Sequence, residues 1–204
     1  LEGYYQETGR AGRDGLEGNC IAYFSPKEIH KFEKFILSNK EKTVSEKEIA
    51  VMQLSEVEAY SESAECRKKF VLHYFGEDMG NCDKCDNCQH PKEQKEAKDE
   101  IKLALQVVAE TNERVNIPNA INILIGRKSA DITANNLDTL KIFGKGSEHD
   151  MVFWNSVVRK AILLNLLEKD IEQYGVLKLT ESGKKFIKKP NSAKIVLNHK
   201  FEDG

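Results

Sequence analysis

The sequence predicts a mainly α-helical protein with a small β component, in which a helical module built around four cysteines precedes a second small domain. Two observations predict this fold class. Cys66, Cys82, Cys85 and Cys88 form a compact cluster that follows several helix-like segments. From Ile101 on, the hydrophobic patterns follow the order helix, helix, helix and β-hairpin. The 204 residues, 40% of them apolar, suffice for two or three small domains.

The first 24 residues combine a loop rich in glycine and arginine with the apolar run Asn19–Phe24, which predicts a buried strand. Cys20 lies alone in this run and is interpreted as a buried core thiol. Leu1 is not an initiator methionine. We therefore expect the chain to be a piece of a longer one, with residues 1–24 as the end of a preceding domain.

Residues 25–92 are expected to form the helical module. Ser25 as N-cap, Pro26 at the first helical position and Glu28 predict a helix that runs to about Ser38. A second capping box begins at Ser45, and a third helix is expected from about residue 63 to 74, with Cys66 in it. The first of these helices is expected to bury its apolar residues, which are Ile29, Phe32, Phe35 and Ile36. The charged stretch 93–100 is interpreted as a linker.

Residues 101–190 are expected to form the second domain. An amphipathic helix begins near Ile101, a second spans Pro118 to about Gly126, and a third spans 152–167, after a short helical turn at 137–143. The runs 166–171 and 176–179 predict a β-hairpin, and a last short helix follows Thr180. This order is that of a winged helix, although other small α+β domains show it too. Residues 191–204 are interpreted as a linker.

Charge is distributed unevenly along the chain, although the net charge is only −2. Residues 1–116 hold 17 Lys/Arg against 23 Asp/Glu, a net of −6, whereas residues 117–204 hold 14 against 10, a net of +4. This asymmetry favours a nucleic-acid contact in the C-terminal part, unless the charges merely solvate the surface. No apolar run approaches the length that crosses a bilayer, so we expect a soluble intracellular protein with no membrane partner.

The cysteine spacing, C-x15-C-x2-C-x2-C, is typical of a metal site. Two-residue gaps bring neighbouring thiolates to one side of a tight turn, and one further thiolate completes a tetrahedron around Zn²⁺. Four protein ligands leave no position open for substrate, so one structural zinc per chain is expected at Cys66, Cys82, Cys85 and Cys88. An iron–sulfur cluster, a histidine ligand (His73 or His90) and a cluster without metal are the alternatives.

The segment Gln6–Gly15 has the form Q-x-x-G-R-x-G-R. Arg10 and Arg13, three residues apart on a loop with several glycines, can both contact one polyphosphate, and planar guanidinium donors stabilise the charge that develops during phosphoryl transfer. The alternative interpretation is a surface loop with scattered arginines. The chain has no G-x-x-x-x-G-K-[ST] loop and no Asp-Glu pair placed to hold Mg²⁺.

The string from Tyr5 to Gly15 resembles the last helicase motif of superfamily 2 enzymes, in the form used by RecQ DNA helicases. The stretch from Glu65 to Cys88 is similar to the zinc module of that family, and the stretch from Leu140 through Trp154 to Glu181 is similar to its winged-helix domain. The resemblance covers roughly residues 3–190 in the right order. It implies that residues 1–24 end the second RecA-like lobe and that Gln6, Arg10 and Arg13 couple ATP to movement.

The resemblance further implies the C-terminal core of a 3′-to-5′ DNA helicase of repair and recombination, cytoplasmic and associated with the bacterial nucleoid. Such a monomeric chain would bind duplex or forked DNA without reading sequence. ATP and Mg²⁺ would bind only to the full-length protein, so this chain alone is expected to hydrolyse no ATP. A zinc-stapled winged-helix transcription regulator and a protein-interaction module are the alternatives.

The winged helix is expected to contact DNA phosphates around its third helix. Ser156, Arg159 and Lys160 are expected opposite the apolar arc of that helix, and Lys141 and Lys145 lie on the loop before it. Tyr174, at the hairpin tip, is either a pin that stacks on the terminal base pair or a plain turn residue.

Overall fold

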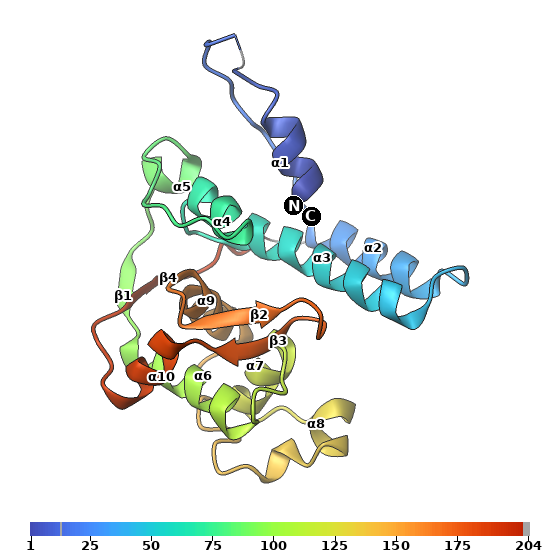
Figure 1. Ribbon diagram of the computed structural model, residues 1–204, viewed down its shortest axis with the longest axis vertical. Helices are drawn as coiled ribbons and strands as arrows, with labels where there is room; N and C mark the ends of the chain where they lie inside the picture. The colour runs from blue at the N-terminus through green and yellow to red at the C-terminus, as the bar shows by residue number, and fades with distance from the viewer. Residues whose placement is uncertain (13, 202–204) are drawn as a thin grey trace. The chain divides into compact units, whose positions relative to one another are not determined.

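The computed structural model describes residues 1–12 and 14–201, and the chain divides into two compact units. The first unit contains residues 1–90 together with the described end of the chain, His199–Phe201. The second unit contains residues 91–198. Figure 1 shows the elements of both units.

The first unit is helical among its described residues. A helical hairpin of α2 and α3 forms its longest part (Figure 1). Shorter helices flank the hairpin on either side in the sequence. The bounds of the five helices are α1 Glu2–Thr8, α2 Pro26–Ser38, α3 Val44–Glu62, α4 Arg67–Tyr74 and α5 Asp86–Gln89.

The sequence predicted the start of α2 correctly and the start of α3 less accurately. Helix α2 begins as predicted, with Ser25 in an extended conformation and Pro26 at the first helical position. Helix α3 begins two residues earlier than predicted, because Thr43 rather than Ser45 is its N-cap. The Glu46 carboxylate accepts the Thr43 backbone N–H at 2.8 Å, and Thr43 Oγ1 accepts the Glu46 N–H at 3.3 Å.

The buried apolar cluster of the first unit is small. It consists of Leu1, Tyr60, Phe70 and Val71, and the side chains of Tyr4 and Tyr74 pack against it. The hydroxyls of Tyr4 and Tyr60 lie 2.9 Å apart. So small a core supplies little stability, and domains of this kind commonly need a further cross-link such as a metal.

The predicted strand at Asn19–Phe24 is wrong, since this segment is irregular. Ile21 and Tyr23 are 80% and 99% exposed, and Cys20 is exposed rather than buried. A lone strand cannot satisfy its backbone groups, and no described strand of this unit pairs with it.

The predicted burial of Phe32 and Phe35 is also wrong. These side chains are 56% and 69% exposed, whereas Ile29 and Ile36 are half-buried. Helix α2 packs on α3, and this packing leaves both phenylalanines largely exposed to solvent.

The second unit has the predicted order of three main helices followed by a hairpin and a last helix. Its elements are β1 Gln94–Glu96, α6 Lys98–Glu110, α7 Ile117–Ile125, α8 Ala130–Ala134, the 3₁₀ turn η1 Leu137–Thr139, α9 Met151–Leu163, β2 Leu167–Asp170, β3 Val176–Leu179, α10 Glu181–Lys188 and β4 Lys194–Val196. Strands β2 and β3 are antiparallel, with Leu167 opposite Leu179 and Asp170 opposite Val176. The winged-helix prediction is confirmed.

A single core holds the second unit together. Helices α6, α7 and α9 pack against one another, and Ile101, Leu105, Leu124 and Trp154 are fully buried among them. The indole Nε1–H of Trp154 donates to the Gly146 carbonyl at 2.8 Å. The loop before α9 is therefore fixed to that helix.

The segments 93–100 and 191–204 were predicted as linkers, but their described parts contain regular structure. Strand β1 pairs antiparallel with β4, with Gln94 opposite Val196, and α6 begins within the first of these segments, at Lys98. The charged side chains misled the prediction because β1 is exposed along its whole length. The burial of Ala97 and Ile195 explains why the pair is ordered.

No helix among the described residues is long and apolar enough to span a membrane.

Candidate metal centre and nucleic-acid interface

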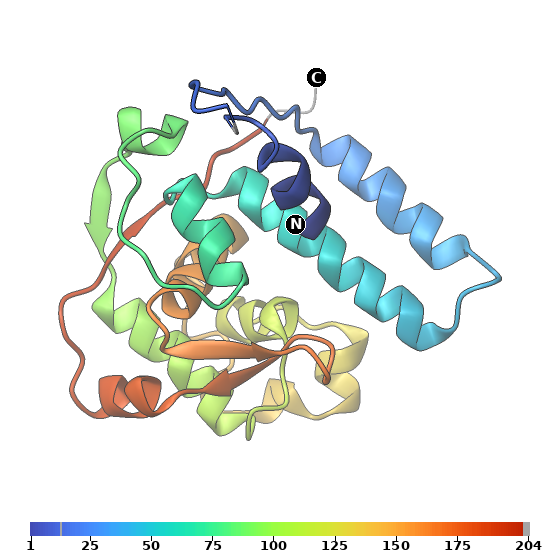
Figure 2. The ribbon, with the colours of Figure 1, turned by 45° about the horizontal axis from the view of Figure 1, so that its top comes forward.

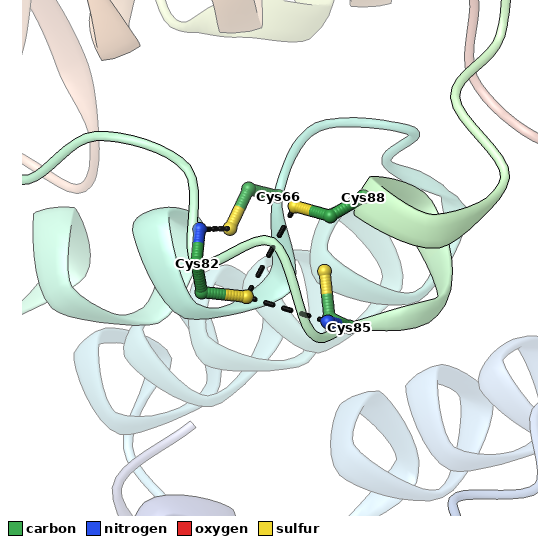
Figure 3. A group of neighbouring side chains, drawn as sticks. All are labelled: Cys66, Cys82, Cys85 and Cys88. Carbon is green, nitrogen blue, oxygen red and sulfur yellow. Dashed lines mark hydrogen bonds between the residues drawn. The ribbon is translucent and has the colours of Figure 1, made fainter.

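The four clustered cysteines come from three places in the first unit. Cys66 is the N-cap of α4, Cys85 is the N-cap of α5, and Cys88 lies within α5. Cys82 lies in the segment between the two helices. Figure 3 shows their side chains pointing toward one another. The N-termini of the short helices α4 and α5 thus lie close together, which brings Cys66 near the three cysteines of segment 82–88.

The sulfur positions fit a tetrahedral metal site. All four Sγ atoms lie within 4.8 Å of one another, and those of Cys82 and Cys88 are 4.0 Å apart. Zinc–sulfur bonds of about 2.3 Å require sulfur separations of about 3.8 Å in a regular tetrahedron. Small side-chain movements therefore suffice to close the cluster around one ion.

Backbone N–H groups point at three of the sulfurs. Cys66 Sγ accepts from the N–H of Lys69 at 3.5 Å and from that of Cys82 at 3.3 Å. Cys82 Sγ accepts from the Cys85 N–H at 3.4 Å, and Cys85 Sγ from the Arg67 N–H at 3.4 Å. Such donors disperse thiolate charge, so they favour the form that binds a metal.

The thiols differ in acidity before any metal binds. Burial raises the pKa of Cys66, and burial together with the Cys85 side chain raises the pKa of Cys88 to about 12. Burial opposes ionisation of Cys82 as well, but the N–H groups of Lys84 and Cys85 outweigh it and lower this pKa to about 7. Metal binding therefore displaces protons from these thiols, and acid weakens it.

Arg67, next to the first cysteine, ties the cluster to α3. Its Nε and Nη2 atoms each donate to the Asp86 carboxylate at 3.1 Å. Its Nη1 donates to the carbonyls of Tyr60 and Ser61 at the end of α3. The Arg67 guanidinium lowers the pKa of Asp86. A charge-assisted bridge thus fixes the start of α5 on the helical hairpin.

Asn87, between two of the cysteines, is buried and fully engaged. Its Nδ2 donates to the carbonyl of Ser63 at 2.9 Å and to that of Glu65 at 2.7 Å, and its Oδ1 lies 2.8 Å from Nε2 of His199. Sequence reasoning took Asn87 for a turn residue and missed Arg67 and His199 as supports of the site. The partners of Asn87 are up to 112 residues away, so spacing gave no signal.

The arginine motif lies at the start of the first unit. Gln6 is exposed on α1, and Arg10 is exposed and forms an ion pair with Glu7 at 3.1 Å. Arg13 lies outside the described residues. The roles predicted for these side chains remain predictions.

Ser156 does not lie on the surface, which corrects the expectation that it faces away from the core. Its contact with DNA stays a prediction. Its side chain is buried, and its Oγ donates to the Val152 carbonyl at 3.0 Å and accepts the Asn198 N–H at 3.1 Å. The helical pattern placed it opposite the core, but the chain around Asn198 covers it. Arg159 and Lys160, on the same helix, are half-buried.

Lys141 and Lys145 are exposed on the loop before α9. Two hydrogen bonds hold this loop on the end of α7: Gly144 N–H donates to the Ile123 carbonyl and Gly146 N–H to the Leu124 carbonyl, each at 2.8 Å. The exposed side chain of Arg127 follows directly after α7.

Arg127 and its neighbour Lys128 therefore belong beside the predicted lysines, although sequence reasoning passed over them. Lys128 pairs with Asp138 at 3.0 Å. Only contacts between the α7 end and a loop about twenty residues later bring these groups together, so periodicity gave no sign of them.

Tyr174 lies at the hairpin tip, as predicted. Its backbone φ is 53°, followed by 78° at Gly175, and its side chain is 43% exposed. A left-handed conformation is unfavourable for a bulky residue, so the presence of tyrosine at this position costs conformational energy.

The chain matches two families of known proteins. The model of the RecQ zinc-binding family matches residues 26–89, and that of the RQC domain matches residues 91–203. The ATP-dependent helicase SGS1 of Saccharomyces cerevisiae is 33% identical over 99% of this chain and 14% of its own length. The ATP-dependent DNA helicase RecQ of Pasteurella multocida is 28% identical over 92% of this chain and 30% of its own length.

The ATP-dependent DNA helicase RecQ of Bacillus subtilis is 30% identical over 71% of this chain and 24% of its own length. The chain therefore spans less than a third of each of these relatives. Two family models together account for nearly all of it, and they divide it where the structure divides it, near residue 90. The four-cysteine centre and the winged helix are those of the RecQ helicase family, to which this chain belongs.

Proposed function

We propose that this chain is the DNA-binding C-terminal region of an ATP-dependent 3′-to-5′ DNA helicase of RecQ type that acts in repair and recombination. It binds duplex or forked DNA through its winged-helix unit, with little dependence on base sequence. The observation that carries the proposal is the exposed basic surface of Arg127, Lys141 and Lys145 in the unit that matches the RQC domain. The relatives in Saccharomyces cerevisiae and Pasteurella multocida are ATP-dependent helicases, which supports the helicase assignment.

The basic side chains act on phosphates. Lys141 and Lys145 present flexible cations on a loop that hydrogen bonds fix to α7, and Arg127 presents another directly after α7. Contacts of this kind give affinity and register without reading bases, and they weaken as salt rises. Arg159 and Lys160 on α9 are proposed to add to this surface.

The hairpin tip acts on the end of the duplex. An exposed aromatic ring stacks on any base, so Tyr174 is proposed to cover the last base pair at a fork.

The zinc centre has a structural role. Cys66, Cys82, Cys85 and Cys88 would hold one Zn²⁺ per chain, and all four of its positions would be filled by protein. The ion then cross-links the α3–α4 region to the segment 82–88, in a unit whose apolar core is small.

ATP chemistry belongs to the longer protein. Gln6, Arg10 and Arg13 are proposed to face the γ-phosphate there, while ATP and Mg²⁺ are held by residues outside this sequence. The chain alone is a monomer that hydrolyses no ATP, and its place in the cell is with the DNA, which in a bacterium is the nucleoid.

Charge reversal tests the DNA surface. Lys141→Glu with Lys145→Glu should weaken binding to a random-sequence duplex and reduce the slope of log affinity against log salt by about 2, roughly one for each phosphate contact. Lys40→Glu with Lys42→Glu, two exposed lysines of the first unit, provides the matched control. An unchanged slope in the first variant would place the DNA surface elsewhere, and strong preference for one duplex over random competitors would indicate a sequence-reading regulator.

A further inference from the structure

The last helix of the winged-helix unit carries a concentrated positive charge that the functions above do not use. From Ser182 to Asn198 the sequence contains five lysines and no Asp or Glu. All five are exposed. Lys184, Lys185, Lys188 and Lys189 lie on α10 or directly after it, and Lys194 lies at the start of β4.

The helix holds these lysines on one side. At 100° per residue, the four positions from 184 to 189 span an arc of about 140°, whereas Gly183, Phe186 and Ile187 fall on the opposite arc. Phe186 is buried in the core and Ile187 packs against it. A side chain at Gly183 would approach the Leu166 carbonyl oxygen to 2.1 Å, so the helix lies directly against the start of the hairpin. The lysine face is thus rigidly placed and points to solvent.

Nearby acids neutralise only part of this charge. Glu181 pairs with Lys184 at 2.8 Å. The Glu96 carboxylate accepts hydrogen bonds from the Ser192 hydroxyl and the Ala193 N–H. Among the described residues, no ion pair involves Lys185, Lys188 or Lys189. These three carry the net charge of the face.

The chemistry of the face of Lys185, Lys188 and Lys189 favours the phosphate backbone of duplex DNA over other polyanions. Single-stranded DNA is held by stacking of bases on exposed aromatic rings as well as by charge. The one aromatic residue of α10, Phe186, is buried. Closely spaced lysines without an aromatic partner fit phosphates that need no stacking, as in duplex DNA.

The face lies away from the hairpin tip. Strand β3 runs from the tip to the start of α10, so Tyr174 and the lysines are at opposite ends of the hairpin (Figures 1 and 2). Thr180 lies six positions after Tyr174 along a mostly extended chain, which at about 3.3 Å per position is about 20 Å. DNA advances about 3.4 Å for each base pair. A backbone that reached α10 would therefore be about six base pairs from the tip.

We propose that the lysine face of α10, formed by Lys185, Lys188 and Lys189, is a second phosphate-binding surface that extends the duplex contact of the winged-helix unit by about half a helical turn. This inference rests on the proposed DNA-binding function.

The test combines charge reversal with DNA length. The variant Lys185→Glu/Lys188→Glu/Lys189→Glu is compared with wild type on forked DNA across a salt series. The paired part is either a short duplex of about 4 base pairs, closed by a non-nucleotide linker and ending before α10, or a long duplex of about 24 base pairs. On the long duplex, the affinity should fall at least about tenfold and the salt slope by about 3, roughly one per lysine. On the short duplex, both should stay within twofold of wild type. Lys27→Glu/Lys31→Glu/Lys34→Glu on exposed α2 is the matched control and should change neither.

The outcomes separate the two proposals. Unchanged binding to the long duplex, or an equal loss at both lengths, overturns the second surface while the DNA-binding function stands. A loss confined to single strands also overturns it. Polyglutamate is also tested. If it binds wild type as tightly as the long duplex does, and does not bind the α10 variant, the face is a binding site for acidic protein and the proposal is overturned. If wild type binds neither duplex at low salt, the proposed function itself fails. Unfolding curves check that the reversed variants fold.

Discussion

His199 closes the zinc module from the far end of the chain, because its Nε2 lies 2.8 Å from Oδ1 of Asn87, between Cys85 and Cys88. The amide nitrogen of Asn87 already donates to two carbonyls, so its oxygen is the acceptor and the imidazole donates. The His199 backbone N–H donates to the Glu62 carbonyl at 2.7 Å, and Phe201 packs against Phe24. The module is thus discontinuous in sequence, and its family model, which ends at residue 89, omits this part.

The first prediction follows from this contact. His199→Ala leaves one acceptor of the buried Asn87 side chain without its partner and loosens the knuckle that holds two of the four sulfurs. Zinc affinity should fall about tenfold, the lower end of the usual range for supports of a metal ligand shell. Competition with a chromophoric chelator measures it. His30→Ala, on exposed α2, is the control. Equal zinc affinity in the two variants would show that the contact of His199 with Asn87 does not support zinc binding.

The second prediction concerns the contact of Gly146 with Trp154. A β-carbon at Gly146 would lie 2.3 Å and 2.7 Å from two carbons of the buried indole, which has no room to move. Gly146→Ala should therefore destabilise the second unit by about 2–3 kcal/mol, as overpacking does in cores. Denaturant unfolding followed by Trp154 fluorescence measures the change. Gly80→Ala, where a β-carbon meets nothing within 4 Å, is the control. A Gly146→Ala protein as stable as wild type would contradict this packing.

The third prediction is a pH dependence at Glu58 on α3. Burial raises its pKa, the Glu33 carboxylate raises it further, and His30 opposes the shift. The folded state therefore holds a proton more tightly than the unfolded state, and stability falls as pH rises from the unfolded pKa through the folded one. Glu58→Gln removes this loss. It should stabilise the first unit at pH 8 by about 0.5 kcal/mol or less, since the group is partly exposed, and by less at pH 5.

The measurement for Glu58 is denaturant unfolding of the zinc-loaded protein at the two pH values. Glu48→Gln, exposed on the same helix, is the control. A Glu58→Gln variant that gains more at pH 5 than at pH 8 would show that the sign of the shift is wrong.

The fourth prediction sets stability against DNA binding at Tyr174. Asparagine tolerates the left-handed conformation better than tyrosine, so Tyr174→Asn should stabilise the hairpin by about 0.5–1 kcal/mol. If the ring stacks on the last base pair, the same change should weaken binding to forked DNA by about 1–3 kcal/mol. Anisotropy titrations with forked and blunt DNA test this, with Ile171→Asn in the same exposed loop as control. Unchanged fork affinity would make Tyr174 a turn residue only.

Local signals predicted much of the fold. The cysteine spacing identified four side chains whose sulfurs the structure brings within 4.8 Å, because the turns and helix starts that gather three of them lie within seven residues. The hairpin at 167–179 and the helix start at Pro26 followed from turn and capping chemistry, which is also local. Such features depend on few neighbours, so a single sequence suffices for them.

Long-range packing accounts for the failures. Ser156 is covered by the chain near Asn198, and β1 is ordered by pairing with a strand about a hundred residues later. Cys20 and Phe35 are apolar but have no cover among the described residues of their unit, so hydrophobicity alone misplaced them. Hydrophobic patterns state which side chains prefer burial, and they do not state which segment supplies the cover.

The most direct measurement counts reactive thiols in the native protein together with bound metal. If four sulfurs hold one zinc, a mild alkylating reagent should modify only exposed Cys20 quickly, and metal analysis should find one zinc per chain. A strong chelator should then release that zinc and make the other four thiols reactive. Five thiols that react at one rate while the helical circular dichroism is unchanged would contradict the zinc centre, and iron in place of zinc would contradict its chemistry.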